Sequence, residues 1–132
     1  MIPHNCIYYY DLESYPNFFS ICIEREFDNA RWQYEISDFK HDGQELFQFL
    51  MQIKQSGGRM AGYNNIGFDY PMLHLLMQQQ GQIDAPTLKQ KCDHIINCGN
   101  NGDRFSNVIW DDGRFVPQLD LMKIHHFDNK SK

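Results

Sequence analysis

Asn-Cys-Ile-Tyr-Tyr-Tyr-Asp-Leu-Glu, residues 5–13, is the stretch that decides the fold. Aromatic and β-branched residues at successive positions are typical of a strand that is buried on both faces, so we expect a central strand here. A turn signal follows at Tyr15-Pro16-Asn17. Residues 18–24 and 31–36 then predict two further strands, with Asp28-Asn29 as the turn between them. Three strands joined by short turns predict a meander.

The rest of the chain alternates predicted helices and strands. Apolar residues at intervals of three and four predict helices over residues 43–55 and 68–80, with a short strand at residues 59–64 between them. Further elements are a helix over 86–96, a loop over 98–103, and a hairpin of strands 106–110 and 114–121 joined by Asp111-Asp112-Gly113. This order predicts one α/β domain over residues 1–132, with a mixed sheet and flanking helices that resembles the ribonuclease H-like arrangement.

Composition supports a single domain and argues against several functions. The 132 residues are 42% apolar and 14% aromatic, which is enough for one core. No apolar run is long enough for a membrane span, and residues 1–5 lack the basic start of a secretory signal, so we expect an intracellular protein. The net charge of −5 disfavours a domain that grips nucleic acid by bulk electrostatics. Acidic residues that bind cations do not conflict with a nucleic-acid substrate.

The four cysteines are expected to be reduced thiols, because the chain carries no export signal. Cys6 and Cys22 lie in apolar, strand-like runs and are predicted to be core residues. Cys92, His94 and Cys98 are close in sequence, yet their spacing matches no common zinc motif and no second Cys/His pair completes a tetrahedron. A four-ligand zinc site is therefore not expected here.

Asp11 and Glu13 are the first candidate site residues. They are two positions apart on the predicted central strand, so their side chains project from the same face. They follow an apolar run, at the point where open α/β sheets place ligand clefts. Two such carboxylates repel each other unless a cation intervenes, and Mg²⁺ or Mn²⁺ is the natural partner of all-oxygen ligands. Taken alone, the Asp11 and Glu13 pair also fits the solvated end of a strand, so the prediction of a metal site needs a contribution from a second part of the chain.

That contribution is the run of residues 62–73, Gly-Tyr-Asn-Asn-Ile-Gly-Phe-Asp-Tyr-Pro-Met-Leu, which combines a strand end, a tight loop and an Asp entering a helix. Asp11-Leu12-Glu13 followed by Ser14 resembles the first motif of the DEDD superfamily of 3′-to-5′ exonucleases. Asn64-x-x-x-Phe68-Asp69 resembles the second motif. The fuller run is similar to the proofreading exonuclease domain of B-family DNA polymerases, including those of phages, and the resemblance covers nearly the whole chain.

The resemblance implies a metal-dependent nuclease that acts on single-stranded DNA 3′ ends. Asp11 would bridge two divalent metal ions, Mg²⁺ or Mn²⁺, while Glu13 would complete one site and Asp69 would hold the other ion, partly through water. Together the ions would activate water and stabilise the leaving oxygen during phosphodiester hydrolysis. The implied partners are a DNA 3′ end and a polymerase domain or another replication protein, with no membrane, in the cytoplasm of a bacterium or a phage-infected host cell.

Four further residues are candidate substrate contacts by resemblance. Ser14 and its backbone would approach the terminal nucleotide, and Asn64 would hydrogen-bond near the substrate, although an Asn at a turn equally fits a left-handed backbone. Phe68 is expected mainly in the core, while the family also uses aromatic residues to hold splayed single-stranded ends. Asp120 occupies the position of an Asp that the family carries on a later strand. His125 and His126 are expected to be surface residues.

The third motif of the family is missing from the sequence. It would place an Asp four or five residues after a Tyr or His, and no Asp after Asp69 has either residue at that spacing. We expect a fragment that lacks the C-terminal helix of this motif, or a short protein that completes its site through another chain. The uncovered sheet would then expose an apolar patch. Alternative functions are a degenerate exonuclease fold that binds nucleic acid or protein without cleavage, and an unrelated ribonuclease H-like nuclease or transposase core.

Overall fold

The computed structural model describes residues 3–103 and 105–122 of the chain. Its regular elements are five strands, three α-helices and two short helical turns. In chain order they are β1 Ile7–Tyr15, β2 Phe18–Arg25, β3 Arg31–Ser37, α1 Gly43–Gln55, β4 Arg59–Gly62, the π-helical turn η1 Asn65–Asp69, α2 Tyr70–Gln78, α3 Ala85–Asn100, the 3₁₀ turn η2 Asp111–Gly113 and β5 Gln118–Asp120.

The five strands form one mixed sheet in the order β3-β2-β1-β4-β5. The pairs β1–β2 and β2–β3 are antiparallel, which gives the predicted meander, and β4 and β5 run parallel to β1. The expected central position of the first strand is confirmed. The pairing of β1 with β4 ends at Tyr9 and Ala61, whereas its pairing with β2 continues to Tyr15 and Phe18. One side of β1 is therefore left without a neighbouring strand from Asp11 onward.

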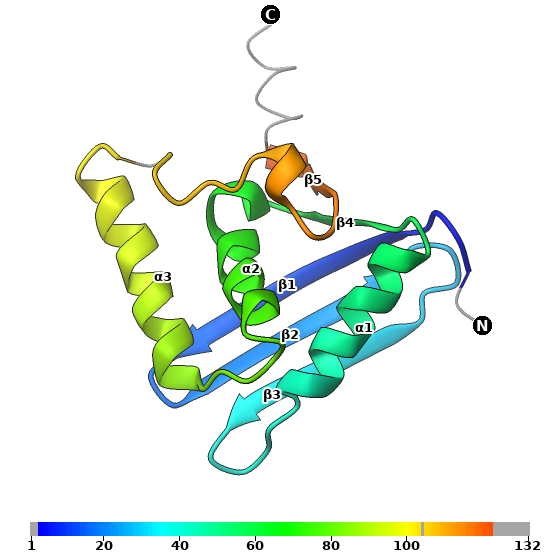
Figure 1. Ribbon diagram of the computed structural model, residues 1–132, viewed down its shortest axis with the longest axis horizontal. Coiled ribbons are helices and arrows are strands. Elements are labelled where there is room, and N and C mark those ends of the chain that lie inside the picture. The colour runs from blue at the N-terminus through cyan, green and yellow to red at the C-terminus, as the bar shows by residue number, and fades with distance from the viewer. Residues whose placement is uncertain (1–2, 104, 123–132) are drawn as a thin grey trace, which may run out of the picture.

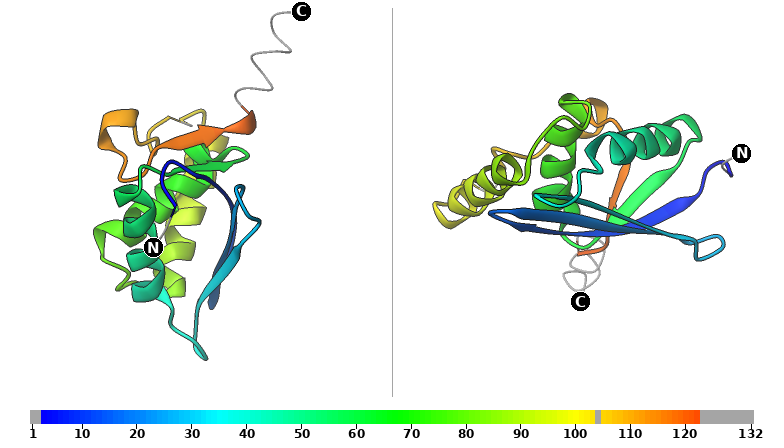
Figure 2. Two further views of the ribbon diagram at one scale, coloured as in Figure 1. Left: turned by 90° about the vertical axis from the view of Figure 1, so that its right-hand side faces the viewer. Right: turned by 90° about the horizontal axis from the view of Figure 1, so that it is seen from below.

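All three α-helices cover the same face of the sheet (Figures 1 and 2). They bury a core to which every strand of the meander and all three helices contribute. Tyr8, Phe19, Leu46, Leu73 and Leu88 are among its fully buried side chains. Aromatic rings interlock between sheet and helix, since Phe49 of α1 lies with its ring centroid 4.6 Å from that of Trp32 and 6.0 Å from that of Tyr8. The chain is thus a two-layer α/β fold over the described residues.

The opposite face of the meander carries no helix among the described residues, and its side chains are mostly polar. Burial along β1 alternates, with Tyr8, Tyr10 and Leu12 buried against the helices and Tyr9, Asp11 and Glu13 exposed. The prediction that this strand is buried on both faces is therefore wrong. Three consecutive tyrosines hide the alternation in the sequence, because the exposed Tyr9 is the same residue type as its buried neighbours. The hydroxyl of Tyr9 donates a short hydrogen bond to the Glu26 carboxylate.

This face carries polar side chains such as those of Asp11, Glu13 and Gln33 together with the exposed rings of Tyr9 and Tyr15. The expectation of an exposed apolar patch stays a prediction. Cys22, predicted to be in the core, is exposed here between Asp11 and Gln33 of the neighbouring strands. Cys6 is buried as predicted.

The helix predicted over 86–96 is confirmed as α3, which extends to Asn100. The loop predicted over 98–103 is therefore wrong in its first three residues. The expected hairpin does not form, because Asp111–Gly113 is a 3₁₀ turn and the strand that follows, Gln118–Asp120, pairs in parallel with β4. The Asp-Gly signal marks a tight turn there, but the strand partner comes from another part of the chain. His125, His126 and the tail lie outside the described residues.

No helix within residues 3–103 and 105–122 is both long enough and apolar enough to cross a membrane.

Candidate functional site

The loop between β4 and α2 begins where β4 stops pairing with β1. Gly62 is the last residue of β4, and a Cβ there would lie 3.1 Å from the Cβ of Asn65, so the tight approach of the loop favours glycine at this position. Asn64 then turns the backbone with a left-handed φ of 59°, a conformation that Asn tolerates better than most residues. Its side-chain oxygen lies against Gly67, where an added Cβ would stand 3.1 Å from it. The chain then enters the π-helical turn η1 and α2, which begins at Tyr70 with proline at its second position.

Asp120 holds this loop in place from the end of β5. Its side chain is 4% exposed, and its two oxygens accept hydrogen bonds from three backbone N–H groups: Asn64 at 2.8 Å, Ile66 at 3.2 Å and Met122 at 3.1 Å. Such an arrangement satisfies a buried carboxylate without a cation. The structure therefore places Asp120 as the anchor of the loop, and its predicted role as a substrate contact remains untested.

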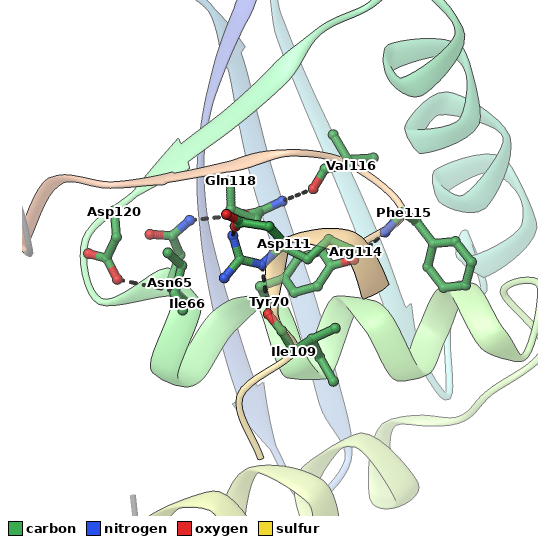
Figure 3. Close-up of polar contacts among 10 residues, drawn as sticks. All are labelled: Asn65, Ile66, Tyr70, Ile109, Asp111, Arg114, Phe115, Val116, Gln118 and Asp120. Atoms are coloured by element: carbon green, nitrogen blue, oxygen red, sulfur yellow. Dashed lines mark hydrogen bonds and ion pairs between the residues drawn. The ribbon is translucent and has the colours of Figure 1, made fainter. Parts of the chain in front are cut away.

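Gln118, two residues before Asp120, is the centre of a buried polar network, and no motif in the sequence singles it out. Its side-chain oxygen accepts from the hydroxyl of Tyr10 at 2.7 Å and from the side-chain amide of Asn65 at 2.9 Å, and its own amide donates to the carbonyl of Val116 at 3.1 Å. Figure 3 shows Asn65 and Gln118 directed at each other across the loop. Through these hydrogen bonds the Gln118 side chain joins β1, η1 and β5.

Tyr70 on α2 joins this helix, through its hydroxyl, to the segment that precedes β5. Its hydroxyl oxygen accepts from the backbone N–H of Phe115 at 2.8 Å, and its proton is therefore free to go to Nδ1 of His74, 3.0 Å away. Burial, together with the nearby charge of Lys91, lowers the pKa of His74, which favours the neutral ring that this bond requires. The segment before β5 is thus fixed to α2 (Figure 3).

Asp69 has surroundings unlike those of Asp120. It is 8% exposed at the junction of η1 and α2, and among the described residues no hydrogen-bond donor is found for its carboxylate. Burial, and then the charges of Asp11 and Asp120, raise its pKa from 3.8 to about 7. A carboxylate that is buried, unpaired and next to other carboxylates is a place where a cation is strongly favoured.

The structure brings Asp11 within electrostatic reach of Asp69, because Asp11 lies on β1 where β4 no longer covers it. Glu13 is on the same exposed face of β1, one pleat further along, and is not among the groups that act on Asp69. Within the described residues, no three His, Cys, Asp or Glu side chains stand together as a ready metal-binding group. Bare carboxylates repel one another, so such a group is expected to close only around a cation.

The donor chemistry of Asp11, Glu13 and Asp69 fits a hard divalent cation. All three offer only carboxylate oxygens, which Mg²⁺ and Mn²⁺ prefer, and Asp69 has no competing partner in the described protein. A bound cation would favour the ionised form of Asp69, which its present surroundings disfavour. These residues are therefore suited to hold such ions, with Asp69 as the buried ligand and the two β1 residues as the exposed ones.

The remaining predicted substrate contacts are placed differently from one another. Asn64 is exposed near the carboxylates, with the left-handed backbone that its alternative interpretation required. Phe68 is half-buried and packs against the core, as expected. Ser14 shares its strand parity with Tyr10 and Leu12, so its side chain lies on the face of β1 opposite Asp11, where its hydroxyl is buried without a hydrogen-bond partner.

An open hollow adjoins Asp11 on the uncovered face of the meander. It has a volume of about 500 Å³, and Tyr9, Asp11, Cys22 and Arg31 are among the residues that line it. Arg31 is already paired with Glu24 at 2.6 Å. The hollow is therefore lined by the Asp11 carboxylate together with aromatic and apolar side chains, among them Tyr9, Ile23 and Trp32.

No protein-family model, no curated protein and no solved structure matches the chain at a significant level. Its function must be inferred from its own residues and their arrangement.

Proposed function

We propose that this chain is a metal-dependent 3′-to-5′ exonuclease domain of the proofreading type, which hydrolyses phosphodiester bonds at single-stranded DNA 3′ ends. The observation that carries the proposal is that the Asp69 carboxylate is nearly buried, has no hydrogen-bond donor among the described residues, and is acted on by the charge of Asp11, which lies on β1 beyond the end of its pairing with β4. The two residues belong to the two sequence motifs that resemble the exonuclease family. Their convergence is what a shared cation site requires, and a merely acidic strand end would not produce it.

The fold gives independent support. A three-stranded antiparallel meander is followed by helix, parallel strand, helices and a second parallel strand, and this is the order expected of a ribonuclease H-like domain. The carboxylates lie where the parallel strands end, which is where open α/β sheets bind ligands. We infer that the chain has a ribonuclease H-like fold.

In the proposed reaction, the chain's own residues position the ions and the DNA end. Asp69 and Asp11 would hold cations beside the scissile phosphate, and Glu13 would complete one site from the exposed face. When bound there, the ions supply an activated water and stabilise the leaving 3′ oxygen. The Asp120 carboxylate would keep the Asn64 loop in the position that sets Asp69. The third motif, which would supply a fourth carboxylate and a group that orients water, has no counterpart in this sequence.

The experiment is degradation of a 5′-labelled single-stranded oligonucleotide with Mn²⁺, read as a ladder of shortened products. Loss of nucleotides from the 3′ end, abolished by Asp11→Asn, supports the proposal. Asp38→Asn removes the same charge from an exposed loop position and is the matched control. Cleavage at internal positions would contradict the proposal and favour the alternative of an unrelated nuclease core.

A second candidate function is a binding module with a degenerate exonuclease fold. The observation that favours it is the absence, within the described residues, of a third acidic or histidine ligand beside Asp11 and Asp69. This candidate predicts that a fluorescent single strand binds without being shortened, with or without Mn²⁺. A melting temperature that Mn²⁺ raises in the native chain and in Asp38→Asn, but not in Asp11→Asn, would instead favour the metal-dependent nuclease even if the isolated chain cleaves slowly.

A further inference from the structure

The amide oxygen of Asn65 is a buried acceptor to which the proposed nuclease assigns no role. The exposed fraction of Asn65 is 0%, and its Oδ1 has no hydrogen-bond donor among the described residues. A buried polar atom without a partner costs stability, so a bound group that satisfies it is expected. Asn65 begins the turn η1, and Asp69, whose carboxylate also has no donor within the described residues, ends it.

The orientation of this amide is fixed by Gln118. The amide nitrogen of Gln118 donates to the carbonyl of Val116, so its oxygen is the atom that faces Tyr10 and Asn65. A carbonyl oxygen can only accept, and Asn65 must therefore turn its Nδ2 towards Gln118. Figure 3 shows the result, with the nitrogen of Asn65 directed at Gln118 and its oxygen on the opposite side. Reversing the amide would set two acceptors against each other.

Asn65 and Asp69 lie on the same side of η1, because residues four positions apart on a helical turn face the same way. The hydroxyl of Tyr10, on the strand that carries Asp11, supports this placement. Burial raises the pKa of that hydroxyl well above its ordinary value, a hydrogen bond with Asn65 lowers it, and the charge of Asp69 raises it. Both side chains therefore act on one buried hydroxyl. The unpartnered amide oxygen and the unpartnered carboxylate belong to one region of the fold.

We propose that Asn65 is a ligand of the divalent cation that Asp69 holds, with Oδ1 as a neutral oxygen donor beside the carboxylates. This role rests on the metal-dependent function proposed above and adds a ligand to its site. Amide oxygens suit hard cations, and a neutral donor adds no repulsion between carboxylates. No third His, Cys, Asp or Glu completes such a group within the described residues, and the amide takes that place. Gln118 is then a positioning residue, which keeps the oxygen of Asn65 directed at the ion.

Titration of the full chain with Mn²⁺, followed by the loss of the free-ion signal in electron paramagnetic resonance, tests the proposal without nuclease turnover. Asn65→Leu removes the amide oxygen at similar volume and should weaken Mn²⁺ binding at least about tenfold, the effect expected for the loss of a metal ligand or of its immediate support. Asn107→Leu is the matched control, because that amide is also buried but accepts from Lys91, and it should leave the affinity unchanged.

The outcomes separate this proposal from the nuclease itself. Mn²⁺ binding that is lost in Asp69→Asn but unchanged in Asn65→Leu would overturn the role of Asn65 and leave the proposed function intact. The absence of Mn²⁺ binding by the native chain would overturn both.

Unfolding of the metal-free chain distinguishes a ligand from a merely structural amide. Asn65→Leu removes an acceptor that has no donor, so it should lower the melting temperature less than Asn107→Leu, which breaks the hydrogen bond from Lys91. A structural amide would show the reverse, with a large loss of stability and an unchanged Mn²⁺ affinity. If the variants do not fold, a crystal structure of the native chain with Mn²⁺, located by its anomalous signal, decides. An ion bound by Asp69 but not contacted by Asn65 Oδ1 would overturn the proposal.

Discussion

Asp69 and Asp120 are two nearly buried carboxylates on either side of one short loop, and they are treated in opposite ways. Asp120 receives three backbone N–H groups and is fully satisfied by the protein. Asp69 has no donor among the described residues and faces the negative charge of Asp11 and of Asp120 itself. Asp120 therefore stabilises the conformation of the loop, whereas Asp69 is held by the loop without a partner of its own. An unsatisfied buried charge costs stability, and a site for a cation explains why it would be kept.

The largest effect is expected from removing the satisfied carboxylate. Asp120→Ala leaves three backbone N–H groups without their acceptor and should lower the free energy of unfolding by roughly 3–5 kcal/mol, measured by urea denaturation. Asp120→Asn, which keeps one acceptor oxygen, should cost less. If Asp120→Ala unfolds at the same urea concentration as the native chain, Asp120 does not anchor the loop.

Removing the unsatisfied carboxylate should have the opposite sign. The pKa of Asp69 in the folded chain is about 7, above its unfolded value of 3.8, so the folded chain binds more protons in between. Stability without metal should therefore fall as the pH rises from about 4 to 7 and then level off. Asp69→Asn should remove this dependence and raise the free energy of unfolding at pH 8. Equal pH profiles for the two chains would show that Asp69 has no raised pKa.

Mn²⁺ should make the native chain more stable relative to Asp69→Asn, which is the opposite of the effect expected without metal. A cation bound to Asp69 replaces the proton, so Mn²⁺ should raise the melting temperature of the native chain more at pH 8 than at pH 6. At 100 times its dissociation constant the ion would add about 2.7 kcal/mol. Asp69→Asn and Asp11→Asn should show little of this gain, while Asp38→Asn should retain it. A Mn²⁺ effect that is unchanged in Asp69→Asn would place the ion elsewhere.

The hydroxyl of Tyr70 should matter less than either carboxylate. Tyr70→Phe deletes the acceptor of the Phe115 N–H and the donor to His74, and should cost about 1–2 kcal/mol in thermal or urea unfolding. Because the hydroxyl is bonded to Phe115 and His74 and to none of the proposed ligands, Mn²⁺ should stabilise this variant as much as the native chain. A selective loss of the Mn²⁺ effect would mean that the packing of α2 also positions Asp69.

The smallest effect is expected at Asn64. Its left-handed backbone suits Gly as well as Asn, so Asn64→Gly should change stability by only a few tenths of a kcal/mol, whereas Asn64→Ala should cost about 1 kcal/mol. If Asn64 also contacts the substrate, Asn64→Gly should weaken the binding of single-stranded DNA while leaving the melting temperature unchanged. This pair of measurements separates the two interpretations of the residue.

Most of the architecture followed from local patterns in the sequence. The meander, the helix over residues 43–55 and the strand after it were predictable because turn residues and apolar spacing change together there. The last strand was not, because β5 has three residues and pairs with β4 across a long connection, while the Asp-Gly turn before it mimics a hairpin. Cys22 was misplaced since an apolar run does not say which of its positions face the open side.

The same limit applies to the site. Asp11 and Asp69 could be selected from their motifs, and the structure brings them together. The roles of Gln118 and Asn65 could not, because a buried amide is recognised only from the partners that surround it in space. Asp120 was selected, but the three N–H groups that it accepts come from the loop and the chain beyond β5, which no spacing reveals.

The exposed thiol of Cys22 offers a direct way to detect metal binding beside Asp11. It stands directly opposite Asp11 in the pairing of β1 with β2, while Cys6 and Cys92 are buried. In a Cys98→Ser background, a fluorophore or spin label can therefore be attached selectively within one strand spacing of Asp11. Quenching of the label by Mn²⁺, a paramagnetic ion, would report occupancy of the edge in solution without any nuclease turnover.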